Sequence, residues 1–224
     1  MSILGLLCCS VAVAQSTPPR YNVVEFSAAA EREVANDLLT ASLYVEDSNA
    51  DPARLASAIN RVLGDALKTA REYPAVKVRS GNQQTYPVYA PRGTQLQGWR
   101  GRAELRLETA DFAAGSGLIG KLQATLQLQS FVLSVSPQAR KATEDALIGE
   151  ALAAFRARAE LVQKALGGKA YKVQRIALGS GFQGSPAPRV MAMRSGVAEA
   201  GVAPPVEAGA SVVSVSANGA VEIE

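Results

Sequence analysis

The 224 residues, 48% of them hydrophobic, are enough to form one domain of ordinary size or two small ones. The formal net charge is only +3 and the basic residues are spread along the chain, which argues against nucleic-acid binding because that function usually needs a concentrated basic face. The chain contains no histidine, which excludes a Ser-His-Asp or Cys-His catalytic unit and the commonest zinc and iron sites.

The N-terminal segment indicates export. Residues 1–14 are uncharged and apolar, and Ala12-Val13-Ala14 has the small-x-small form of a signal-peptidase site. The run is too short to cross a bilayer. We therefore expect a signal peptide at 1–14 and a periplasmic mature chain, with a buried N-terminal strand or helix as the alternative. Cleavage after Ala14 would remove Cys8 and Cys9, so we expect neither a disulfide nor thiol chemistry.

Two strands and a helix are predicted at the start of the mature chain. Residues 21–27 have a strand-like composition, and in 37–46 apolar and polar residues alternate as in a strand with one buried face. Asp51 is a good helix cap and Pro52 fits a first helical turn, which predicts a helix over about 52–72.

Two extended segments follow, at 75–89 and 97–108, and the residues at 90–93 between them are typical of a turn. The second segment alternates clearly, so one of its faces is expected to be buried. The residues on that face are Ala103, Leu105 and Leu107.

A short helix and another strand come next. Asp111 is the expected cap of a helix that reaches Leu122. The strand covers 126–135, and its inward residues are expected to be Leu126, Leu128, Phe131, Leu133 and Val135.

The longest predicted element is a helix over about 137–166. Its apolar residues recur at steps of three and four, Ser136 can cap its start, and Gly167-Gly168 can end it because one glycine can adopt the left-handed conformation. A helix of about 30 residues is roughly 45 Å long, so we expect it to lie across a sheet. A strand up to Ser180 follows it.

The C-terminal part combines a loop and a strand. Residues 181–204 are rich in glycine, proline and small residues and are expected to be a loop or partly ordered, whereas 206–224 alternates again and should be a closing strand. Strands joined by tight turns favour antiparallel pairing, so we predict an α+β fold with a mainly antiparallel sheet packed by the helices at 137–166 and 52–72.

Two patterns resemble functional motifs. Gly115, Gly117 and Gly120 match the G-x-G-x-x-G fingerprint, but six residues separate them from the preceding strand, and we interpret them as a short helix packed close to a sheet. Glu144, Asp145 and Glu150 are close enough on one helix for acid/base chemistry, but nearby basic residues favour surface ion pairs.

Three stretches resemble the SIMPL-domain family of exported bacterial proteins, which includes a periplasmic immunogenic protein. They are GWRGRAELRLETADF (98–112), the segment 133–179, and VEAGASVVSVSANGAVEI (206–223). In the middle segment the family's Ser-x-x-Pro-like entry is 134–137, its Ala-Arg-Ala-Glu is 157–160 and its Ala-Leu-Gly stop is 165–167. The family usually has an early Pro-Asp where this chain has Asn36-Asp37.

The resemblance implies a SIMPL-like domain over 15–224 with no agreed enzymatic activity and no catalytic residues to carry over. Family members are associated with the periplasm or outer membrane, with protection against oxidative stress and, in some cases, with large hollow homo-oligomers. We therefore expect a non-enzymatic, self-assembling envelope protein that is compatible with peripheral outer-membrane association. We predict no catalytic, cofactor-binding or metal site, no nucleic-acid partner and no transmembrane span.

For self-assembly, 211–224 is the expected exposed edge, because unpaired backbone groups on an edge strand invite pairing with another subunit. Two alternatives stay open. One is a periplasmic binding module for a small or peptide-like ligand in the groove between sheet and long helix. The other is a hydrolase that uses Glu144, Asp145 and Glu150.

Overall fold

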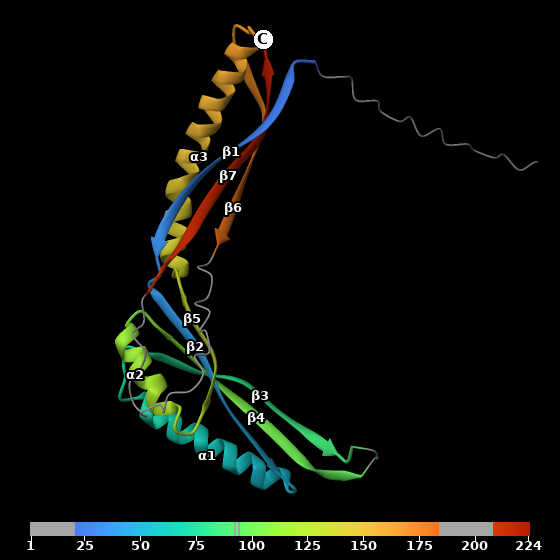
Figure 1. Cartoon of the computed structure of the whole chain (residues 1–224), viewed down its shortest axis with the longest axis vertical. Coiled ribbons are helices and arrows are strands. Elements are labelled where there is room, and N and C mark those ends of the chain that lie inside the picture. Colours follow the sequence, from blue (N-terminus) through green and yellow to red (C-terminus); the bar gives the residue numbers. More distant parts are fainter. Residues whose placement is uncertain (1–20, 92, 94, 184–207) are drawn as a thin grey trace, which may run out of the picture.

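The computed structural model describes residues 21–91, 93, 95–183 and 208–224; the expected signal peptide at 1–14 and the part of the expected loop at 184–204 lie outside them. In the described part of the chain, seven strands form two antiparallel sheets and three helices pack against them, which confirms the α+β class. One sheet is covered by one helix and the other by two. The two sheets follow one another along the long axis of an elongated molecule (Figure 1).

The first sheet has the strand order β1-β7-β6 and is covered on one face by the long helix. Its elements are β1 (Val23–Ala35), α3 (Pro137–Ala165), β6 (Tyr171–Gln183) and β7 (Ala210–Ile223). The buried side chains of α3 come from every fourth position, Leu147, Ala151, Phe155 and Ala159, and they pack on the inner face of β7 and on β1. The helix therefore lies across a sheet, as its length predicted.

The predicted limits of α3 are confirmed. The Ser136 hydroxyl accepts a hydrogen bond from the backbone N–H of Ala139 at 3.2 Å, and Pro137 occupies the first turn. At the other end Gly167 has a φ of +72°, the left-handed conformation that closes many helices.

The second sheet has the order β3-β4-β2-β5, with α1 and α2 on one face. Its elements are β2 (Leu38–Asn49), α1 (Pro52–Ala70), β3 (Lys77–Tyr89), β4 (Leu96–Thr109), α2 (Phe112–Leu122) and β5 (Gln127–Ser134). The predicted inward face of β4 is confirmed, because Ala103, Leu105 and Leu107 are buried while the residues between them are not. This alternation leaves the opposite face of the sheet polar.

Two predictions about the first sheet are wrong. Residues 181–183 do not begin a loop, because β6 continues to Gln183. The segment 211–224 is not an exposed edge, because β7 pairs with β1 on one side and with β6 on the other. The error has a physical source in β1, which extends beyond the predicted 21–27 as far as Ala35. The added residues are rich in alanine and glutamate, which have low strand propensity, and they are held as a strand by their long-range pairing with β7.

The expectation for β5 also needs correction. Leu126 and Val135 are buried, but Leu128 and Phe131 remain 38% and 36% exposed. They face the helical side through their pairing with Leu43 and Ala41 of β2, but β5 is an edge strand beyond the strands on which α1 and α2 pack. Their direction follows the predicted pattern, whereas their burial does not.

The two sheets meet at Asn36 and Asp37, the dipeptide between β1 and β2. The buried Asn36 amide donates to the Ala208 carbonyl at 2.7 Å and accepts from the Ser211 hydroxyl at 2.7 Å, and the Asn36 N–H donates to Gly209. These bonds attach the end of β1 to the start of β7.

Asp37 makes the corresponding link to α3. Its carboxylate accepts the Ser136 N–H at 2.5 Å and the Ser136 hydroxyl at 2.8 Å, and its own N–H donates to the Ser134 carbonyl at 3.1 Å. The start of β2, the end of β5 and the cap of α3 are therefore joined at one residue.

Replacing Asn36 with alanine should lower the free energy of unfolding by about 1–3 kcal/mol, because buried partners lose their hydrogen bonds. Urea unfolding followed by circular dichroism measures this change. Asn218→Ala is the matched control, since Asn218 lies exposed on β7 with one side-chain bond of 3.3 Å, and its effect should stay within about 0.5 kcal/mol. Equal losses in both variants would contradict the proposed role of Asn36.

Candidate functional site

The edge strand β6 carries exposed apolar side chains on the face of the first sheet where α3 lies. Val173, Ile176, Leu178 and Phe182 are 37–47% exposed. Their partners in the register are Val221, Gly219, Ala217 and Val213, on the face of β7 that α3 covers. Because α3 lies mainly over β1 and β7, the described residues leave the apolar row of β6 largely uncovered (Figure 1).

This edge is less protected than the other three. Natural sheets protect their edges with charges, prolines, bulges or short strands. β1 carries Glu25, Glu31, Arg32 and Glu33, β3 contains Pro87 and a register shift, and β5 has only 8 residues with a register shift of its own. β6 has a register shift of its own, between Val173 and Arg175, but beyond it the stretch 176–183, IALGSGFQ, contains neither charge nor proline. It is the edge most open to pairing with a further strand.

A cavity of about 610 Å³ lies where α3, β2, β5 and β6 meet. We call it the junction cavity. Its lining is mixed, with apolar residues (Leu38, Val135, Pro137 and Phe182) and polar ones (Ser134, Arg140, Lys141 and Glu144). Such a lining suits a ligand that has an apolar body and one or two polar groups.

The charged groups of the junction cavity are held by neighbours on α3. The Arg140 guanidinium lies 5.4 Å from the centre of the Phe182 ring and 3.1 Å from the Glu144 carboxylate. Lys141 bonds to Asp145 at 2.8 Å, and this hydrogen bond raises the pKa of Lys141 above its usual value. Each of these two cations therefore lies beside a carboxylate of α3.

The three carboxylates considered for hydrolysis do not converge on one point. Glu144 and Asp145 bind Arg140 and Lys141, as the prediction of surface ion pairs requires. Glu150 pairs with Arg32 of β1 and not with a neighbour on its own helix. Since each carboxylate has its own cation, the geometry does not supply the paired acid and base that hydrolysis would need.

The glycine pattern lies within α2. Asp111 caps this helix, and a Cβ atom added at Gly115 would lie 2.8 Å from Thr109 Cγ2 and 3.1 Å from Leu39 Cδ1. The absence of a side chain at Gly115 lets the helix approach the sheet, which is the packing that the sequence predicted. The G-x-G-x-x-G match has no dinucleotide-binding turn here, because it lies inside a helix.

Trp99 is half-buried against Leu55 and Ile59, beside a shallow depression of about 300 Å³ at the far end of the second sheet.

Within the described residues, no three His, Cys, Asp or Glu side chains are grouped as metal ligands. None of the helices in this part of the chain combines the length and apolar composition that a bilayer crossing requires.

Gly115→Ala should destabilise the protein by about 1–3 kcal/mol, because the new methyl group would overlap Thr109 and Leu39 in a packed core. Gly120→Ala is the control in the same helix: nothing lies within 4 Å of its added Cβ, so the gain in helix propensity should stabilise the protein by about 0.5–1 kcal/mol. Urea unfolding of both variants measures the two effects, and changes of the same sign would contradict the packing role of Gly115.

Comparison with known proteins identifies the family but no near relative. No curated protein matches the chain. Among solved structures, an amidase of the hydantoinase/carbamoylase family from Burkholderia multivorans matches with 14% identity and a TM-score of 0.27, over 54% of this chain and 33% of that one. AtUAH in complex with glyoxylate matches with 13% identity and a TM-score of 0.25, over 50% of this chain and 29% of that one. The present chain covers about a third of the length of these two proteins, and TM-scores this low do not establish a shared fold.

The match to a family model is far more extensive. The model named SIMPL, a protein of unknown function (DUF541), matches residues 24–221. This range includes the three helices and all of both sheets except Val23 of β1 and the last two residues of β7. The chain therefore belongs to the SIMPL family.

Proposed function

We propose that this protein is an exported, periplasmic component of the cell envelope that acts by assembling with copies of itself and not by catalysis. Membership of the SIMPL family and the apolar segment at 1–14 support the envelope location. The observation that carries the proposal of self-assembly is the unprotected edge of β6, with its exposed apolar row.

Two copies can pair through β6 in antiparallel fashion about a two-fold axis. Such pairing satisfies the unpaired backbone N–H and C=O groups of both edges and joins the two first sheets into one. The apolar row of each copy, Val173, Ile176, Leu178 and Phe182, would then be covered by the partner's β6 and α3. The family's association with oxidative stress suggests an indirect protective role, since a chain without histidine and with no cysteine after residue 14 has few groups for direct scavenging.

Light scattering over a concentration series should give a discrete oligomer for the wild-type protein at every concentration. Leu178→Lys places a charge in the apolar row of β6 and should dissociate that oligomer, because an unpaired charge is costly to bury. Leu161→Lys on α3 is the matched control: Leu161 is 67% exposed and lies outside β6, so the oligomer should persist. A wild-type monomer at all concentrations would overturn the proposal.

A second candidate function is the binding of a small or peptide-like ligand, and the junction cavity favours it. Its volume of about 610 Å³ falls within the usual range for ligand pockets, and apolar walls surround a few charged groups there. Its position between the start of α3 and Phe182 of β6 supports a ligand that binds beside this helix.

For this alternative, a ligand present at about 100 times its Kd should raise the Tm by roughly 5–10 °C in a thermal-shift screen. Phe182→Ala removes an apolar wall of the junction cavity and should reduce that shift. Leu166→Ala, which truncates an exposed side chain at the other end of α3, should leave it unchanged. An equal loss in both variants would place the ligand elsewhere.

A further inference from the structure

One row of side chains crosses the outer face of the second sheet and plays no part in the functions proposed above. In the strand register, Arg79 of β3 lies opposite Arg106 of β4, Arg106 lies opposite Ser42 of β2, and Ser42 lies opposite Ser130 of β5. We propose that this arginine–serine row binds a dianionic phosphoryl group.

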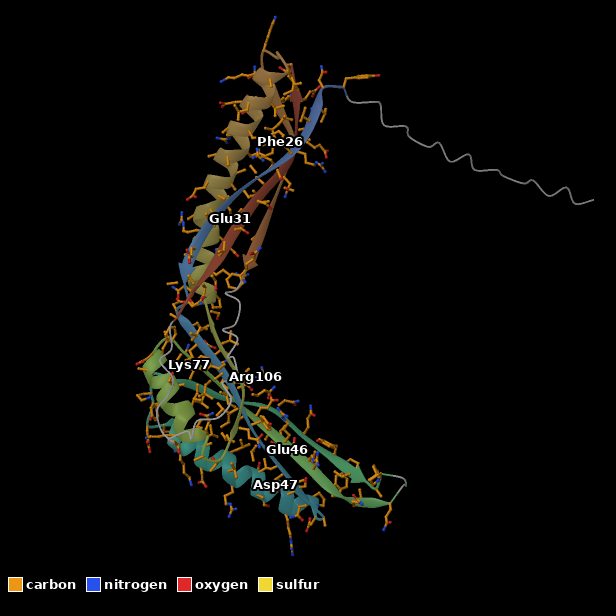
Figure 2. The ribbon with its side chains drawn as sticks, in the orientation of Figure 1. Phe26, Glu31, Glu46, Asp47, Lys77 and Arg106 are labelled. Carbon is orange, nitrogen blue, oxygen red and sulfur yellow. The ribbon has the colours of Figure 1, made fainter. Side chains whose placement is uncertain are left out.

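The row lies on the face away from the helices. Leu105 and Leu107, on either side of Arg106, are fully buried under α1 and α2, so Arg106 projects from the opposite face of β4. Arg79, Arg106 and Ser130 are exposed and Ser42 is half-buried. In Figure 2, Lys77 and Arg106 lie between the junction of the two sheets and the acidic pair Glu46 and Asp47 further along β2.

The two arginines form a like-charged pair without compensation. Side chains directly opposite in an antiparallel sheet have Cβ atoms about 4.5–5.5 Å apart, and like charges in such positions destabilise the sheet. Within the described residues, neither Arg79 nor Arg106 makes a side-chain hydrogen bond or an ion pair. An anion bound between the two guanidinium groups would relieve this repulsion.

In the cross-strand rows on either side of Arg106, positive and negative charges balance. The excess positive charge therefore lies on the arginine–serine row. On one side Lys77 lies opposite Glu108. On the other side Glu104 pairs with Arg102 at 3.8 Å. Both carboxylates flank Arg106 along β4, but each already has a cation near it. The excess is therefore about two positive charges, from the two guanidinium groups.

The chemistry of the row fits a phosphoryl group better than a carboxylate. A guanidinium binds two oxygens of a phosphate through parallel N–H donors, and two guanidinium groups together match its double negative charge. The Ser42 and Ser130 hydroxyls can donate to a further oxygen. Neighbouring strands are about 4.8 Å apart, so the long arginine side chains can reach over β2 toward the hydroxyls.

An open sheet face can accept this group as free phosphate or as the terminal phosphomonoester of a lipid headgroup, and the test separates these sources. Isothermal titration at low ionic strength and about pH 8 uses inorganic phosphate, which is then mostly dianionic. A parallel sedimentation assay uses vesicles of phosphatidylcholine with and without phosphatidic acid. Binding in either assay that depends on the row supports the proposal, and binding only to the phosphatidic acid vesicles identifies the lipid as the source.

Arg79→Gln and Arg106→Gln should each weaken binding about tenfold, the effect of losing a charge-assisted hydrogen bond. Arg156→Gln is the matched control, because it removes one positive charge from an exposed position on α3. Both test variants should unfold at the same urea concentration as the wild type or at a higher one, since they relieve the repulsion between Arg79 and Arg106.

Two outcomes would overturn the proposal. The first is that the wild-type protein binds neither phosphate nor phosphatidic acid vesicles. The second is that Arg156→Gln weakens binding as much as Arg106→Gln, which would indicate attraction by net charge alone. The row lies on the second sheet and shares no residue with β6 or the junction cavity, so its failure and that of the proposed self-assembly are distinguishable.

Discussion

The hydrogen bonds of Asn36 and Asp37 are the constraint on which the arrangement of the two sheets depends. Asn36 fixes the end of β1 to the start of β7, and Asp37 fixes the start of β2 to the cap of α3 at Ser136. A proline at position 36 would have no N–H, whereas Asn36 donates its own to Gly209, so asparagine makes a contact that proline could not make.

Both surfaces to which we assign a role in the first sheet follow from the position of α3. The helix is anchored at its start by Asp37 and packs on β1 and β7. Its buried apolar side chains therefore contact these two strands and cover little of β6. Because α3 lies to one side of β6, the apolar row on β6 stays uncovered and the junction cavity forms beside Phe182. The second sheet differs, because α1 and α2 cover its central strands and leave the polar face open.

Local patterns in the sequence predicted the elements well and their neighbours poorly. Ser136, Pro137 and Gly167 set the limits of α3 through short-range geometry, which can be read from sequence. The division into two sheets and the central place of β7 depend on pairing between distant segments, which alternation does not specify. The same limit applies to the candidate sites. The facing of Arg79 and Arg106 depends on the register of β3, which shifts between Ser80 and Gln83, so no spacing in the sequence indicates it.

The central position of β7 also determines the order in which the molecule can form during synthesis. The second sheet is built from one continuous stretch, 38–134, and its strands can pair as soon as that stretch is available. The first sheet must wait, because β1 has no partner until β7 follows, and the bond between Ser211 and Asn36 closes a separation of 175 residues. Contacts this distant form slowly. The inner face of α3 therefore remains without a complete sheet to pack on until late, and a chain shortened before β7 would keep a complete second sheet beside a helix whose apolar face is exposed.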